Sequence, residues 1–115
     1  MNMSGSIVQR YGEVRGSGDG QLNQPRYLAL DRYGNVLVAD RSNNRVVLLS
    51  PSLTLLGYIT VPENALCKPT ALHLDLLTYR LYIGEYPNTG RVFVLDIDDS
   101  ILMSTVNSER YCDII

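Results

Sequence analysis

PRYLALD at residues 25–31 decides the fold, because it returns as PTALHLD at residues 69–75. The proline, both leucines and the aspartate match at an offset of 44 residues. Two further pairs match at offsets of 45 and 46: VLVAD (36–40) with LYIGE (81–85), and NRVVLL (44–49) with GRVFVL (90–95). Offsets that grow by one at each step indicate loop insertions between matched strands. The chain therefore contains an internal repeat, and this repeat determines the architecture.

The apolar runs inside each repeat unit are short and rich in Val, Leu, Ile and Tyr, and turn residues bound them. This pattern predicts strands joined by turns. We expect strands at 27–31, 35–40, 45–49 and 54–60 in the first unit, and at 71–75, 80–85, 91–96 and 101–105 in the second. In the first turn, Gly34 is expected to take a positive φ after Asp31 opens the turn.

Several predicted strands are apolar at consecutive positions, as in VVLL at 46–49. A sheet with one wet face would alternate, so these strands are expected to be covered on both faces. Antiparallel four-stranded units of this period, each covered by its neighbours, are typical of β-propeller blades. We predict an all-β chain with one blade over 25–60 and a second over 69–105. Residues 7–13 would form an outer strand of a preceding blade, and 106–115 a tail that leads onward.

A propeller closes with about four to eight blades. Residues 1–115 supply about two, joined through connections at 14–24 and 61–68. The ring is therefore expected to be incomplete. Either the chain is a piece of a longer propeller, which is the interpretation we favour, or several copies assemble to close a ring.

The first unit resembles the NHL repeat through GDGQLNQP (18–25), LALD (28–31), GN (34–35), VAD (38–40) and NNRV (43–46). The second unit keeps a reduced set: Pro69, Leu72, Asp75, Glu85, Asn88, Arg91 and Val92. NHL repeats build propellers in tripartite-motif ubiquitin ligases, RNA-binding translational repressors, extracellular lyases and bacterial sensors. The resemblance therefore implies a fold more strongly than it implies a function.

Composition narrows the function classes. The chain is 45% hydrophobic and 19% charged, which is a globular balance. Ten basic and twelve acidic side chains give a net charge of -2, which argues against a generally basic nucleic-acid binder. The sequence shows neither a signal segment nor an apolar run of membrane-spanning length, so a cytoplasmic location is expected.

Few residues offer catalytic or metal-binding chemistry. The two cysteines, Cys67 and Cys112, can supply neither a disulfide framework nor a four-ligand zinc site. His73 is the only histidine, whereas a lyase of the NHL class would need several as metal ligands. The acidic run at 96–100 lacks the glycine and glutamate that a calcium loop needs later in its sequence. We therefore predict no catalytic, cofactor or metal site, and no enzyme activity.

Two acid–arginine pairs recur in the repeat: Asp40 with Arg45, and Glu85 with Arg91. Each acid ends one strand and each arginine opens the next, so the two side chains can face each other across a hairpin. A guanidinium and a carboxylate can then pair through two parallel hydrogen bonds. The pairs are predicted to staple the turn within each blade. The alternative is that they line the end of the propeller and contact a ligand.

Arginines and tyrosines gather in the first unit: Arg10, Arg15, Arg26, Arg41 and Arg45 with Tyr11, Tyr27 and Tyr33. We single out Arg26, Tyr27 and Arg41 as candidate partner-binding residues. The expected function is protein recognition, as in the substrate-recruiting part of a tripartite-motif-like ubiquitin ligase. An RNA-binding propeller face is the alternative, because cations and stacking rings also bind single strands. A fragment of an NHL-class lyase is the third hypothesis.

Overall fold

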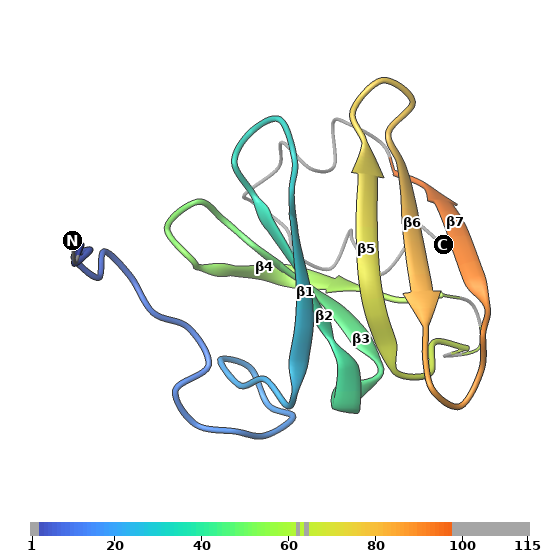
Figure 1. Ribbon diagram of the computed structural model, residues 1–115, viewed down its shortest axis with the longest axis horizontal. Helices are drawn as coiled ribbons and strands as arrows, with labels where there is room; N and C mark the ends of the chain where they lie inside the picture. Colours follow the sequence, from blue (N-terminus) through green and yellow to red (C-terminus); the bar gives the residue numbers. More distant parts are fainter. Residues whose placement is uncertain (1–2, 62, 64, 98–115) are drawn as a thin grey trace.

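The computed structural model describes residues 3–61, 63 and 65–97, and these residues form two antiparallel sheets (Figure 1). Sheet 1 runs in the order β1 (Pro25–Leu30), β2 (Val36–Asp40), β3 (Arg45–Leu49) and β4 (Leu55–Ile59). Sheet 2 runs in the order β5 (Pro69–Asp75), β6 (Arg80–Glu85) and β7 (Val92–Asp96). A short 3-10 turn, η1 (Arg41–Asn43), joins β2 to β3. The all-β prediction is confirmed, and the arrangement is consistent with an incomplete propeller.

The strand boundaries follow the repeat. Each described strand lies within two residues of its predicted ends. The predicted strand at 101–105 and the tail at 106–115 lie outside the described residues. Residues 7–13 form no strand, which differs from the outer strand predicted there. A strand needs a hydrogen-bonded neighbour, and none of the described strands pairs with this segment.

The β1–β2 turn shows why the first repeat unit folds locally as predicted. Gly34 has a φ of 82°, and its N–H donates to the Asp31 carbonyl at 3.2 Å. The Asp31 carboxylate accepts the backbone N–H groups of Tyr33 at 2.8 Å and Asn35 at 2.9 Å. It also accepts the Asn35 side-chain amide at 2.7 Å. Asp31 thus satisfies the donors of the turn that it opens.

The core lies between the two sheets. Sheet 1 contributes Leu37, Ala39, Val46, Leu48, Leu56 and Ile59. Sheet 2 contributes Leu72, Leu74, Leu81 and Ile83. β1 lies beside β5, and the sheets diverge from these neighbouring strands (Figure 1). This side-by-side packing of two sheets by their faces is the relationship expected between adjacent blades.

The second face of each sheet differs between the units. In sheet 1, Val38, Val47 and Leu49 are also buried, and Tyr11 and Leu22 from the preceding segment pack against them. β2 and β3 are therefore covered on both faces, as predicted. Sheet 2 instead alternates between buried and more exposed positions. Of the two faces of sheet 2, only the face that packs against sheet 1 is buried within the described residues.

Candidate functional site

One end of the two sheets carries the predicted acid–arginine pairs. We call it the stapled end and define it by the β2–β3 turn at 41–44, the β6–β7 turn at 86–90, and the connections that lead into β1 and β5. Pro25 lies opposite Asp40, and Pro69 lies opposite Glu85. Each acid therefore stands beside the first residue of its own sheet. The β1–β2 and β5–β6 turns lie at the other end (Figure 1).

In the first blade, the Asp40 carboxylate is fully buried, and both of its oxygens accept hydrogen bonds. Its Oδ1 accepts the backbone N–H of Asn23 at 2.7 Å. Its Oδ2 accepts the side-chain amide of Asn43 at 2.8 Å and the Nε–H of Arg45 at 2.8 Å. The carboxylate thus holds both the hairpin turn and the connection that precedes β1.

Arg45 completes this arrangement through backbone carbonyls. Its terminal nitrogens donate to the carbonyls of Ser17 at 2.9 Å, Gly18 at 3.3 Å and Gln21 at 2.9 Å. Its guanidinium also lies 4.4 Å from the centre of the Tyr58 ring. The predicted pairing through two parallel bonds is therefore wrong in geometry. Only Nε reaches Asp40, because the terminal nitrogens bind the connection.

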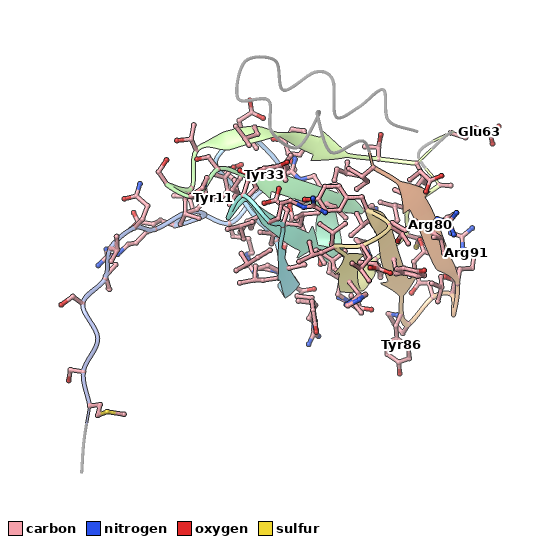
Figure 2. All side chains as sticks on the ribbon, turned by 90° about the horizontal axis from the view of Figure 1, so that it is seen from above. Tyr11, Tyr33, Glu63, Arg80, Tyr86 and Arg91 are labelled. Carbon is pink, nitrogen blue, oxygen red and sulfur yellow. The ribbon has the colours of Figure 1, made fainter. Side chains whose placement is uncertain are left out.

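The second blade repeats the arrangement. Glu85 accepts the backbone N–H of Cys67 at 2.6 Å, the Thr89 hydroxyl at 2.6 Å and the Nε–H of Arg91 at 2.7 Å. Arg91, which Figure 2 labels, donates in turn to the Ala65 carbonyl at 2.8 Å. Burial of Glu85 raises its pKa, but the bonds from Thr89, Arg91 and Cys67 outweigh burial, so that the pKa lies below its ordinary value.

The two acid–arginine pairs, which we call the staples, bind the same backbone positions relative to the proline that begins each sheet. The arginine binds the carbonyl of the residue four places before the proline, at Gln21 or Ala65. The acid binds the N–H of the residue two places before the proline, at Asn23 or Cys67. Both acids are buried, so they are occupied with holding the incoming connection to its blade. This geometry favours the stapling interpretation over direct ligand contact.

The candidate partner-binding residues lie on the surface of the stapled end. Arg26 and Tyr27 are exposed on β1, and Arg41 begins η1 directly after Asp40. Because Pro25 faces Asp40, Arg41 lies across from Gln24, two positions before Arg26 on the neighbouring segment. Arg41 donates to the side-chain carbonyl of Gln24 at 2.9 Å. The structure thus brings these three predicted residues into one region.

The structure adds Lys68 to this region. The Lys68 backbone N–H donates to the side chain of Asn44 at 2.9 Å, which joins the second connection to the first hairpin. We call Arg26, Tyr27, Arg41 and Lys68 the cationic patch. Within the described residues, none of its three cations forms an ion pair, and the acids of the stapled end are paired with Arg45 and Arg91 instead. The sequence signal for Lys68 is its position directly before Pro69, which matches Gln24 before Pro25.

The other arginines and tyrosines of the first unit lie elsewhere. Arg10 pairs with Glu13 at 3.2 Å in the N-terminal segment, and Arg45 belongs to the staple. Tyr11 packs on sheet 1. Tyr33 lies in the β1–β2 turn at the opposite end. The cluster seen in the sequence is therefore only partly a cluster in space.

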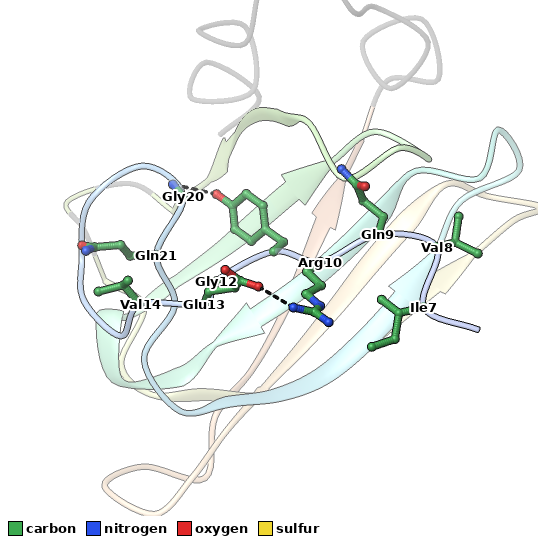
Figure 3. A pocket seen from close by; sticks show the side chains of 10 residues that line it. Ile7, Val8, Gln9, Arg10, Gly12, Glu13, Val14, Gly20 and Gln21 are labelled. Atoms are coloured by element: carbon green, nitrogen blue, oxygen red, sulfur yellow. Dashed lines mark hydrogen bonds and ion pairs between the residues drawn. The ribbon is translucent and has the colours of Figure 1, made fainter. Parts of the chain in front are cut away.

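The N-terminal segment outlines a hollow of about 770 Å³, lined mainly by residues 7–14 (Figure 3). Its charged lining residues, Arg10 and Glu13, are the pair described above, and Tyr11 accepts the Gly20 N–H at 2.9 Å. His73 is exposed on β5, with its ring 6.2 Å from that of Tyr82. Among the described residues, no group of three or more His, Cys, Asp and Glu side chains could hold a metal ion.

Comparison with known proteins gives short matches. A stretch of 31 residues is 61% identical to Protein lin-41 of Caenorhabditis elegans and covers 27% of this chain and 3% of that protein. A stretch of 42 residues is 48% identical to Protein wech of Drosophila melanogaster and covers 36% of this chain and 5% of that protein. No protein-family profile matches the chain. The two matches point to NHL-type repeats.

The matched stretches thus span only a small fraction of either relative. No helix in the described ranges has the length and apolar character needed to cross a bilayer.

Proposed function

We propose that this chain is a non-catalytic, cytoplasmic interaction module of the NHL-propeller type that recognises a protein partner through the cationic patch. In a tripartite-motif-like ubiquitin ligase, such a module would be the part that recruits the substrate. The partial similarity to lin-41 and wech supports this class of module, as does the NHL-like motif of the first repeat unit.

One observation carries the proposal: Arg26, Arg41 and the exposed Tyr27 gather where β1 begins and β2 ends, at the stapled end. Tyr27 is 50% exposed next to Arg26, and Leu28, which points to the opposite face of β1, is 61% exposed. Arginine and tyrosine are the side chains that most often anchor protein interfaces, and an apolar neighbour adds burial. This mixture favours a protein segment with acidic and apolar groups as the partner.

The test places a photo-reactive phenylalanine analogue at Tyr27 in the full chain, within ribonuclease-treated cell extract. Wild type is expected to give defined protein adducts that Arg26→Glu reduces at least tenfold. The control is Arg80→Glu, which makes the same charge change at an exposed position outside the patch; because it also removes the ion pair with Asp96, its fold is checked by circular dichroism. Adducts that survive Arg26→Glu in a folded variant would refute the assignment of the patch.

RNA is the second candidate, because the cationic patch combines three cations with the exposed Tyr27 ring. Three phosphate contacts to a single strand would lower affinity about twentyfold for a fourfold rise in salt. Titration of a single-stranded oligonucleotide at several salt concentrations separates the two candidates. We expect no such complex at physiological salt. A sub-micromolar, steeply salt-dependent complex that Arg26→Glu abolishes would establish RNA as the ligand instead.

A further inference from the structure

The face of sheet 2 that points away from sheet 1 is apolar and exposed. Cross-strand register places His73, Tyr82 and Val94 in one row, and Ala71, Gly84 and Val92 in the next. Val92 is 64% exposed and Val94 is 50% exposed. Half or more of each valine is thus exposed to solvent, although β-branched apolar side chains are the kind that sheets normally bury.

The internal repeat identifies what this face corresponds to in sheet 1. At the repeat offsets, the row of His73, Tyr82 and Val94 matches Ala29, Leu37 and Leu48, and the row of Ala71, Gly84 and Val92 matches Tyr27, Ala39 and Val46. The matching face of sheet 1 is the one that sheet 2 covers. The exposed face of sheet 2 is therefore equivalent to a face that receives another sheet.

The same argument identifies the sheet that would fit. Sheet 2 covers sheet 1 with the rows Leu72, Ile83, Phe93 and Leu74, Leu81, Leu95. Their equivalents in sheet 1 are the rows Leu28, Val38, Val47 and Leu30, Val36, Leu49. These residues form the outer face of sheet 1, which points away from sheet 2. Leu28 and Leu30 on this face are each 61% exposed.

We propose that a second copy of this chain docks the outer face of its sheet 1 onto the exposed face of sheet 2. The contact repeats the interface between sheets 1 and 2 that the structure already contains. Because the two docking faces differ, the contact is head to tail, and each added copy leaves one face of each kind available.

The N-terminal segment covers one of the two docking faces. Residues 9–13, which we call the strap, and Leu22 lie over the outer face of sheet 1, with Tyr11 packed against its buried valines. A groove of about 480 Å³ remains between the strap and the sheet, with Leu28, Val36 and Leu49 in its lining. Figure 3 shows the Arg10–Glu13 pair within the strap. Docking therefore requires the strap to move aside and expose the groove.

The experiment measures the mass of the full chain in solution as its concentration rises, by light scattering and sedimentation. Val94→Glu alters the exposed face of sheet 2, and Leu28→Glu alters the outer face of sheet 1. Each is expected to weaken assembly at least about thirtyfold, the effect of losing an interface hot spot. Leu77→Glu is the matched control, because Leu77 is 96% exposed in the β5–β6 turn, away from both faces.

An equimolar mixture of the two variants distinguishes head-to-tail from symmetric contact. Val94→Glu keeps an intact outer face of sheet 1, and Leu28→Glu keeps an intact face of sheet 2. One productive contact is therefore possible, so the mixture should form heterodimers and nothing larger. Tyr11→Ala should loosen the strap and increase assembly of the otherwise unchanged chain.

Three results would overturn the proposal. The first is a wild-type chain that stays monomeric up to about 1 mM, the range of the weakest specific association. The second is assembly that Val94→Glu abolishes and Leu28→Glu leaves intact, because this pattern indicates contact between two copies of sheet 2. The third is a mixture that forms no heterodimer although both variants retain the wild-type thermal midpoint.

Discussion

Asp40→Ala is the substitution whose effect the structure predicts most directly. The change removes a fully buried carboxylate and leaves three donors without their acceptor: the Asn23 backbone N–H, the Asn43 amide and the Arg45 Nε–H. Removing one partner of a buried ion pair destabilises a protein by about 3–5 kcal/mol. Arg45 is only 13% exposed, so water cannot readily replace the lost carboxylate.

The expected cost lies at the lower end of this range, about 3 kcal/mol. Arg45 keeps its bonds to the carbonyls of Ser17, Gly18 and Gln21, so its charge remains partly solvated by backbone dipoles. The second staple provides an internal comparison. Arg91 is 48% exposed, so water can reach it once Glu85 is removed. Glu85→Ala is therefore expected to cost less, about 1–2 kcal/mol.

The assay is urea unfolding followed by circular dichroism, with both variants and wild type at one protein concentration. Partner binding is measured on the same samples. A cost below about 1 kcal/mol for Asp40→Ala would refute the reasoning, since the buried-pair estimate is larger. The stapling interpretation would also be contradicted if Asp40→Ala kept full stability and lost partner binding.

Three further predictions follow from individual side chains. Because the pKa of Glu85 is lowered in the folded state, the Glu85 carboxylate contributes its full stabilisation above its ordinary pKa and loses it as pH falls through the lowered value. In urea unfolding at several pH values, Glu85→Gln should therefore flatten the acid side of the curve of stability against pH. Burial and the hydrogen bond to Asp19 raise the pKa of Tyr58 to about 12, so its contribution is present below pH 10 and is lost as pH rises toward 12. In an absorbance titration of tyrosinate formation, Tyr58→Phe should remove the phase near pH 12 and leave the remainder unchanged. Gly34→Ala should cost about 1 kcal/mol in urea unfolding, because φ is 82° and the added Cβ would lie 3.4 Å from Pro51; an unchanged midpoint would contradict the turn assignment.

The repeat made the strands predictable, because each run of apolar residues had a second copy to support it. The first turn was also predictable, because it depends only on the positive φ of Gly34 and on the hydrogen bonds that Asp31 makes to its neighbours. The pairing of Asp40 with Arg45 was also accessible, since both residues flank one short turn. These features depend on contacts between residues close in the chain.

The remaining features depend on contacts that the sequence does not display. The terminal nitrogens of Arg45 bind carbonyls more than twenty residues away, and backbone acceptors carry no signature in the side-chain pattern. Residues 7–13 were predicted as an outer strand of a preceding blade, but strand formation also requires a hydrogen-bonded partner. The exposure of one face of sheet 2 could not be predicted from the sequence either, because its apolar residues are of the same kind as those in the core of sheet 1.

The staples also set a rule for which loop lengths the repeat can accept. In both blades the arginine binds the carbonyl four residues before the proline, and the acid binds the N–H two residues before it, so the length of this segment is fixed. Upstream of Gln21 and Ala65 the two connections differ in sequence. Residues inserted upstream of Ser17 in the first connection, or upstream of Ala65 in the second, would loop outward and leave the bonds of both arginines intact. A single residue inserted between Gln21 and Pro25 would shift one acceptor out of reach. Engineers who graft binding loops onto this scaffold therefore have a tolerant site and a forbidden one only a few residues apart.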